Sequence, residues 1–410
     1  MITYQYFTLD NGLKVYCIED STTPMAVVNL LYNVGSRDEK PSMTGFAHLF
    51  EHLMFGGSAN IPSYDTPLQQ VGAENNAFTS PDITNYYVSI PAQNIETALW
   101  LESDRMLALS FQQKVLDVQK NVVIEEYKQR YLNQPYGDVW LHLRDMVYDV
   151  HPYKWPTIGK EISHIENAHM DDVKDFFYKY YAPNNAILVL AGNITLEHAK
   201  TLTHKWFADI PMRNVPAKNL PLEPIQTQKK SLIINRNVPM RAIYKAFHVC
   251  HRLHNDYYAT DLLSEILGRG QSSRLYQYLV KDKKIFNNIS AYITGSIDAG
   301  LLVIEGKINP DISFDTAEKE IDNCLITIDT DILDTDLLKT QNQAMTNILL
   351  SETELLNKAM NLAYFANIGT PELINSELEH IAKVTTQDIV SAKKTYLHHD
   401  NSSVLYYDMA

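Results

Sequence analysis

Cysteine is scarce in this chain, and long apolar runs are missing altogether. Its 3 cysteines stand far apart and form no CxxC pair, which excludes a disulfide framework and favours a reducing compartment. No uncharged apolar stretch approaches the roughly 18 residues that span a bilayer. The opening MITYQYFTLDNG has neither the basic residues nor the apolar run of a signal peptide. We therefore expect no membrane insertion and a cytoplasmic location.

Positive charge is also in short supply. The 410 residues include 35 Lys and Arg against 49 Asp and Glu, which gives a net charge of -14. This negative charge disfavours binding to nucleic acid or to an anionic membrane. Hydrophobic residues make up 45% of the chain and charged residues 20%, as in packed globular proteins. The length predicts at least two domains, and the charge favours neutral or basic partners.

A proline-rich segment near the midpoint predicts an interdomain linker. Four prolines fall within PMRNVPAKNLPLEP, between the strand-like ILVLAGNI and the apolar SLIINR. Such a cluster favours extended backbone. We therefore expect one domain over residues 1–210, a linker over 211–228 and a second domain over 229–410.

The two sides of this linker show signs of duplication. PMAVVNLLYNVGSR at 24–37 shares Pro, Met, Val and Arg with PMRAIYKAFHVCHR at 239–252, and a helical pattern follows each segment. We predict an α+β fold of two homologous domains, each a mixed, mainly antiparallel sheet packed with helices. The periodicity also predicts helices over 110–133 and 333–366.

One short segment carries residues suited to metal chemistry. TGFAHLFEHLMFGG, in a helix predicted over 42–55, contains His48, Glu51 and His52 in the order HxxEH. Residues four apart share a helix face, so both imidazoles can reach one cation with Glu51 beside them. Neutral imidazole favours zinc, and a catalytic zinc takes three protein ligands, so a third must come from elsewhere. A helix that merely carries two histidines is the alternative.

Around this segment the chain resembles the pitrilysin, insulin-degrading enzyme and mitochondrial processing peptidase family of inverted zincins, whose zinc helix carries HxxEH. The shared motifs are DNGLKVY, NVGSRDE, HLFEHLMFGG, GAENNAFTSPDITNYYVSIP, VQKNVVIEEYKQR, HPYKWPTIGK, YYAPNNAILVLAGNI and GRGQSSRLYQYL, which span nearly the whole chain. The resemblance implies that residues 1–210 form the catalytic, zinc-binding domain. It also implies that residues 229–410 form a non-catalytic wall of the substrate chamber.

The resemblance further implies a third zinc ligand. The family's later glutamate falls on Glu126 when its pattern is laid on QKNVVIEE. Glu126 also stands on a predicted helix whose Val115, Val118 and Val122 indicate an apolar face. The neighbouring Glu125, about 100° away on that helix, is the competing candidate.

The implied activity is zinc-dependent endopeptidase hydrolysis of unfolded or extended peptides. In this reaction the zinc activates a water molecule as the nucleophile, and Glu51 is the general base that accepts the proton of that water. One Zn2+ per chain is expected, because the second half carries Asp261, Ser264 and Glu265 in place of the HxxEH residues.

Substrate binding is expected along NNAFTS. In the family this stretch is a sheet edge near the zinc, where an extended peptide adds as a further strand through main-chain hydrogen bonds. The resemblance thus assigns substrate binding to Asn76, Ala77, Phe78 and Thr79. An ordinary strand with an Asn turn is the alternative.

Several positions depart from the family's pattern. Gln119 stands where relatives have a second glutamate, and it can orient a neighbour by hydrogen bonding but carries no charge. Lys281 and Asn288 stand where larger relatives have an arginine and a tyrosine. The nearby Tyr292 is a candidate substitute for the missing phenol.

These departures leave two alternative functions open. One is a non-catalytic core or partner subunit of a peptidase complex, and the other is a processing peptidase for a dedicated precursor peptide. Larger relatives build the chamber from four such domains, whereas this chain has two. The resemblance therefore implies a homodimer or a heterodimer with a paralogous subunit.

Overall fold

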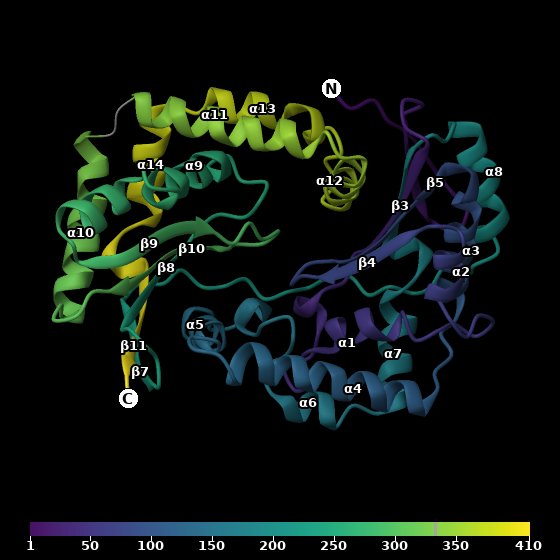
Figure 1. Ribbon diagram of the computed structural model, residues 1–410, viewed down its shortest axis with the longest axis horizontal. Helices are drawn as coiled ribbons and strands as arrows, with labels where there is room; N and C mark the ends of the chain where they lie inside the picture. Colours follow the sequence, from purple (N-terminus) through teal and green to yellow (C-terminus); the bar gives the residue numbers. More distant parts are fainter. Residues whose placement is uncertain (332–333) are drawn as a thin grey trace. The chain divides into compact units, whose positions relative to one another are not determined.

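The computed structural model describes residues 1–331 and 334–410, which divide into two compact units. Unit 1 comprises residues 1–128, 155–220 and 349–376, and unit 2 comprises residues 129–154, 221–348 and 377–410. Each unit is built around one β-sheet packed with helices (Figure 1).

The sheet of unit 1 has the strand order β1-β2-β6-β3-β5-β4. Its strands are β1 (Gln5–Thr8), β2 (Lys14–Glu19), β3 (Met25–Tyr32), β4 (Glu74–Thr79), β5 (Thr84–Pro91) and β6 (Ala186–Gly192). β2 and β6 run parallel, and the other neighbours are antiparallel. The sequence MAVVNLLY of β3 is buried on both faces, as a covered central strand requires. The sequence ENNAFT of β4 alternates between exposed and half-buried residues, and β4 forms one edge.

The sheet of unit 2 has the strand order β7-β11-β8-β10-β9. Its strands are β7 (Lys230–Arg236), β8 (Ala242–His248), β9 (Phe286–Ile293), β10 (Leu301–Ile308) and β11 (Ser402–Met409). β7 and β11 run parallel and the other neighbours are antiparallel, so the order matches β2-β6-β3-β5-β4 of unit 1. β3 and β8, which carry the weak sequence repeat, hold the same central place. The expected α+β fold with two helix-packed sheets is confirmed.

Helices account for most of the remaining chain. The helices of unit 1 are α1 (Phe46–Leu53), α2 (Asp65–Gln70), α3 (Ile95–Leu107), α4 (Gln113–Tyr127), α6 (Ile162–Glu166), α7 (Met170–Tyr180), α8 (Leu196–Phe207) and α12 (Leu355–Asn367). Those wholly or mostly in unit 2 are α5 (Val139–Val147), α9 (Tyr257–Gly268), α10 (Phe314–Asp331), α11 (Asp334–Ser351), α13 (Leu373–Lys383) and α14 (Thr386–Tyr396). Two π-helical segments are η3 (Lys128–Leu132) and η6 (Tyr276–Asp282). No helix in the described parts of the chain combines the length and the apolar character needed to cross a membrane.

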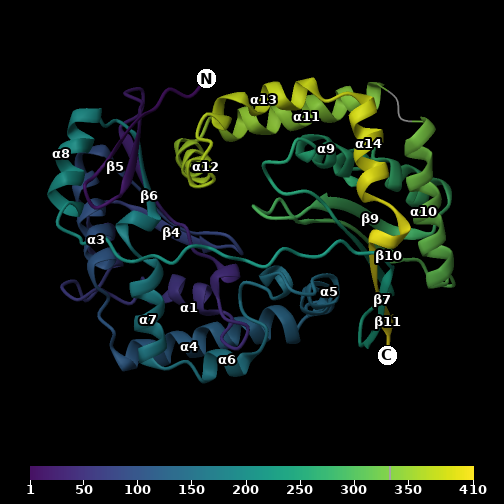
Figure 2. The same ribbon diagram turned by 180° about the vertical axis from the view of Figure 1, so that it is seen from behind.

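One face of the sheet in unit 1 is covered by a helix from the second half of the chain. The helix α12 lies alongside β3 and β6, as Figure 1 and the reverse view in Figure 2 show. Its buried residues recur at the spacing of an amphipathic helix face. They are Ala359, Leu362, Ala363, Phe365 and Ala366. The small alanines let the helix approach the sheet closely.

In unit 2 the corresponding place on β11 and β8 is taken by α5, from the first half of the chain. Its Val139, Leu143 and Val147 join the core on that face of the sheet. Segments 129–154 and 349–376 therefore depart from the linear boundaries expected from the sequence. Between the halves, the unit boundary at 220/221 falls within the proline-rich segment.

The helix expected over 333–366 proves to be two helices; residue 333 itself lies outside the described residues. α11 ends at Ser351 and α12 begins at Leu355. The Asn357 side chain donates to the carbonyl oxygen of Ser351 at 3.1 Å, which satisfies a carbonyl at the end of α11. The break thus separates a helix mostly of unit 2 from a helix of unit 1.

Candidate metal centre

The helix α1 carries the HxxEH residues and is held at its N-terminus by a buried carboxylate. Glu39 accepts hydrogen bonds from the backbone nitrogens of Gly45 at 2.9 Å and Ala47 at 2.8 Å. The Trp155 indole donates to the same carboxylate at 3.1 Å. Burial raises the pKa of Glu39, and these donors oppose that shift. These hydrogen bonds satisfy two backbone N–H groups at the N-terminus of α1, so Glu39 fixes the start of the helix.

The glycine before α1 has no substitute in this geometry. Gly45 has a φ of 89°, and a Cβ there would lie 2.6 Å from the carbonyl oxygen of Ile158. The helix therefore begins at Phe46 rather than at the expected residue 42. The sequence does not predict this role for Glu39. The only hint in the sequence is that Glu39 ends the NVGSRDE motif, six residues before Gly45.

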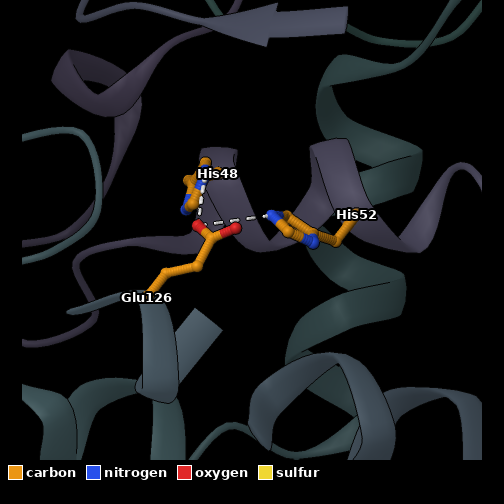
Figure 3. A group of neighbouring side chains, drawn as sticks. All are labelled: His48, His52 and Glu126. Carbon is orange, nitrogen blue, oxygen red and sulfur yellow. Dashed lines mark ion pairs between the residues drawn. The ribbon is translucent and has the colours of Figure 1, made fainter. Parts of the chain in front are cut away.

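The structure brings His48, His52 and Glu126 together. Nε2 of His48 lies 3.6 Å from Oε2 of Glu126, and Nε2 of His52 lies 3.8 Å from the same oxygen. Figure 3 shows the two rings directed from α1 toward the carboxylate that rises from α4. The side chains are 11%, 19% and 30% exposed, respectively, so the cluster is sheltered yet reachable from solvent.

The position of Glu126 follows from the way α4 packs. The helix buries Leu116, Val123, Ile124 and Tyr127. The apolar face expected from the valines is wrong, because Val118 is 49% exposed and Val122 is 39% exposed. Helical periodicity predicts that the face with the valines is buried. In the structure a different face of α4, which includes Leu116 and Tyr127, packs against the core. Glu126 borders this buried face and so reaches α1.

The competing Glu125 lies in different surroundings. Its carboxylate accepts a hydrogen bond from Lys128 at 2.7 Å, and the side chain is 62% exposed. Among the described residues, the cluster of metal-capable side chains contains Glu126 and not Glu125.

The donor set and its spacing fit a zinc ion. Zinc takes nitrogen and oxygen ligands at about 2.0–2.2 Å, which places tetrahedral neighbours roughly 3.3 Å apart. The 3.6 Å and 3.8 Å separations are close to that value and longer than hydrogen bonds. Within the described residues, Oε2 of Glu126 is buried and receives no hydrogen bond. A buried carboxylate oxygen without a donor is costly, and a cation between the three groups removes that cost.

Glu51, the expected base, reaches the edge strand β4. The Thr79 hydroxyl donates to Oε2 of Glu51 at 2.6 Å. The four residues expected to bind substrate all lie on β4, at the edge of the sheet in unit 1. Phe78 is 40% exposed, and Ala77 and Thr79 are half-buried.

A buried ion pair lies close to Phe55, two residues after the end of α1. Arg105 forms two hydrogen bonds with Glu102, at 2.8 Å and 2.6 Å, and its guanidinium lies 4.3 Å from the ring centres of Tyr64 and Tyr86. Burial raises the pKa of Tyr86, and the charge of Glu51 adds to that shift. The charge of Glu51 therefore acts on one aromatic residue of this cluster.

The remaining candidates are placed as follows. Gln119 is half-buried on α4, seven residues before Glu126 and thus on nearly the same helix face. Lys281 is exposed on η6, and Asn288 is exposed on β9. Tyr292, also on β9, donates to Glu305 at 3.3 Å. Burial and this carboxylate raise the pKa of Tyr292. Lys281, Asn288 and Tyr292 all belong to unit 2.

Comparison with known proteins agrees with this geometry. Residues 14–160 match the model of the insulinase family (peptidase family M16), and residues 167–344 match the model of the peptidase M16 inactive domain. The chain is 30% identical over 326 residues to the zinc protease PqqE of Helicobacter pylori, which covers 78% of this chain and 73% of that protein. It is 25% identical over 357 residues to the uncharacterized zinc protease YmxG of Bacillus subtilis, with 87% and 86% covered.

A solved structure shares the fold over the full length. The crystal structure of a protease from Helicobacter pylori matches with a TM-score of 0.92 at 26% identity, and the match covers 100% of both chains. Two matching family models, a relative at 30% identity and this structural likeness confirm the resemblance seen in the motifs. The chain therefore belongs to the insulinase family of peptidases, family M16.

Proposed function

We propose that this protein is a zinc-dependent endopeptidase that hydrolyses unfolded or extended peptides. The observation that carries the proposal is the convergence of His48, His52 and Glu126, whose ligand atoms all lie within 4.8 Å of one another. The proposal is also supported by relatives that are named zinc proteases. One zinc ion per chain is proposed.

The chemistry divides between the metal and the residues of the chain. His48, His52 and Glu126 would hold the zinc ion, which would supply Lewis-acid chemistry toward a peptide carbonyl and a water molecule. Glu51 follows His48 by three residues on α1, which sets its carboxylate beside the imidazoles. It accepts the proton of the attacking water and delivers a proton to the leaving amine.

The strand β4 supplies the proposed peptide-binding edge. Its open side can accept an extended peptide as one more antiparallel or parallel strand, through main-chain hydrogen bonds. We assign this role to Asn76, Ala77, Phe78 and Thr79. Binding of this kind reads backbone rather than sequence, so permissive cleavage of unfolded peptides follows. Lys281 and Tyr292 remain proposed contributors to the transition state, and Gln119 a proposed orienting residue.

A second candidate function is a non-catalytic core or partner subunit of a peptidase complex. Two observations favour it: residues 167–344 match an inactive-domain model, and Gln119 replaces a charged residue of the family. A processing peptidase for a dedicated precursor uses the same centre as the first candidate. In each case we propose a homodimer, or a heterodimer with a paralogous subunit, in the cytoplasm.

The variant Glu51→Gln tests the proposal. It keeps the shape of the side chain and removes the base, so zinc content measured by atomic absorption should stay at one per chain. Cleavage of an unstructured, fluorescence-quenched peptide should fall by about 10²- to 10⁴-fold. A chelator should abolish cleavage by the parent, and added zinc should restore it. A parent that binds zinc but cleaves no peptide would support the partner-subunit function instead.

A further inference from the structure

The contact between Thr79 and Glu51 joins the proposed peptide edge to the proposed base. Thr79 is the last residue of β4, and its hydroxyl donates to Oε2 of Glu51 at 2.6 Å. We infer that Thr79 is a positioning residue, which orients the Glu51 carboxylate and couples that orientation to a peptide bound along β4. The inference rests on the proposed peptidase function.

The side chains of β4 alternate between two environments. Asn75, Ala77 and Thr79 are half-buried, whereas Asn76 and Phe78 are exposed. Successive residues of a strand point to opposite faces, so Thr79 shares the covered face with Ala77 and Asn75. Helices α1 and α2 pack on this strand. The hydroxyl of Thr79 is therefore directed at α1 by the pleat of the strand itself.

The main chain of the same residue faces the other way. The hairpin after β4 is closed by a hydrogen bond from the Ser80 nitrogen to the Ile83 oxygen, and Thr79 is paired with Thr84. Hydrogen-bonded and non-hydrogen-bonded pairs alternate along an antiparallel ladder. Thr79 thus belongs to a non-hydrogen-bonded pair, and its backbone N–H and C=O point to the open edge of the sheet.

Thr79 can therefore act at two sites at once. Its backbone is available to an added peptide strand, while its hydroxyl holds one oxygen of Glu51. A β-branched side chain is stiff at χ1, so the hydroxyl moves with the strand rather than by rotation. A hydrogen bond to a carboxylate is also stronger than one between neutral groups. A peptide that orders β4 should consequently order the base.

A purely structural alternative makes a different prediction. If Thr79 only ties β4 to α1, its loss should loosen the fold or weaken peptide binding. A positioning role instead lowers turnover while peptide binding and zinc content stay the same. Thr201 offers a matched control, because it is an exposed threonine on α8 whose hydroxyl donates to the backbone oxygen of Glu197 at 2.9 Å.

The test compares Thr79→Val, Thr79→Ser and Thr201→Val in the full chain with zinc. Thr79→Val keeps the β-branched shape without the hydroxyl, and we expect kcat to fall about 10- to 100-fold because a misplaced group is a poor catalyst. KM should stay within about 2-fold, and zinc should remain at one per chain. Thr79→Ser should restore most of kcat, and Thr201→Val should behave like the parent. An unchanged kcat in Thr79→Val, a loss confined to KM, or a failure of serine to rescue would overturn the inference.

A crystallographic readout separates this inference from the proposed function. Crystal structures of the parent, Thr79→Val and Thr79→Ser need no turnover. We expect the Glu51 carboxylate to leave its parent orientation in the valine variant and to keep it in the serine variant. An unchanged Glu51 rotamer in Thr79→Val would overturn the positioning role even if the parent is an active peptidase. A parent without peptidase activity would instead overturn the proposed function, while the rotamer comparison still decides the role of Thr79.

Discussion

Glu125 and Glu126 are neighbours in the chain, but their carboxylates lie in different surroundings and contact different residues. The Glu125 carboxylate pairs with Lys128 at 2.7 Å in solvent, whereas Oε2 of Glu126 lies 3.6 Å from Nε2 of His48. A rotation of about 100° per residue around α4 produces this difference. The pair thus offers an internal comparison for the proposed metal centre.

Removing the carboxylate of Glu126 should empty the proposed metal centre, and the same change one residue earlier should not. For Glu126→Gln we expect zinc affinity to fall by more than the roughly 10- to 100-fold typical of lost supporting contacts, because a ligand itself is lost. Glu125→Gln should bind zinc like the parent. Competition titration with a chromogenic chelator measures both. Equal zinc affinity in the two variants would rule out Glu126 as a ligand.

The glycine at the start of α1 should be irreplaceable for a reason beyond its backbone angle. Gly45 and Gly369 have similar φ values of 89° and 85°, but a Cβ at 45 meets a carbonyl oxygen at 2.6 Å and a Cβ at 369 meets nothing within 4 Å. Both Ala variants bear a left-handed strain of about 1–2 kcal/mol. Gly45→Ala should lose about 1–3 kcal/mol more through overpacking. Urea unfolding compares the two, and equal losses would contradict the clash.

The stability of the protein should be sensitive to the loss of one partner of the buried pair Arg105–Glu102. Arg105 and Glu102 are each 1% exposed, so Arg105→Met leaves a buried charge and should cost about 3–5 kcal/mol. The double variant Arg105→Met, Glu102→Leu should recover part of that loss, since no charge then remains. Lys200→Met, which breaks an exposed pair with Glu197, should change stability by less than about 1 kcal/mol. Thermal or urea unfolding measures the stability of each variant. An Arg105→Met variant as stable as the parent would contradict the prediction.

Acid should weaken unit 2 through Glu318. Burial by itself would raise the pKa of this carboxyl, but Lys245, together with hydrogen bonds from Lys229 and Tyr406, lowers it from 4.5 to about 2. Because the folded pKa lies below the unfolded one, the stabilisation is complete above pH 4.5 and fades as the pH falls toward 2.

Removing the Glu318 carboxyl should therefore flatten the acid response. Stability of Glu318→Gln should depend less on pH between 4.5 and 2 than that of the parent, as read by urea unfolding at a series of pH values. Glu197→Gln removes a carboxylate that pairs with Lys200 in solvent and serves as the control. The same slope in Glu318→Gln and the parent would exclude Glu318 as a source of the acid sensitivity.

The parts of this protein that the sequence predicts are those set by local spacing or by a shared motif. The turn between His48 and His52 depends only on helical geometry, and the motifs predict the family that the comparisons confirm. Periodicity could not choose the packed face of α4, because Val118 and Val122 look apolar but meet solvent. The choice depends on which neighbours surround the helix, and those come from distant segments.

Contacts between distant segments were the least predictable. Glu39 caps α1 from a loop, and Thr79 meets Glu51 across a strand and a helix. Neither contact has a fixed sequence spacing that a pattern could detect. The single helix expected over 333–366 was wrong for a similar reason. The helical pattern of the sequence gives no sign of the break between Ser351, where α11 ends, and Leu355, where α12 begins.

The exchange of α5 and α12 has a consequence for how this chain can be divided. A fragment that stops at the proline-rich segment would contain every strand of the first sheet but would bare Val27, Leu31 and Val189, which α12 covers. The complementary fragment would lack α5 and bare the face around Tyr244 and Leu405. We therefore expect that neither half folds independently. Splitting the gene at the midpoint would yield two aggregation-prone polypeptides that need each other to fold.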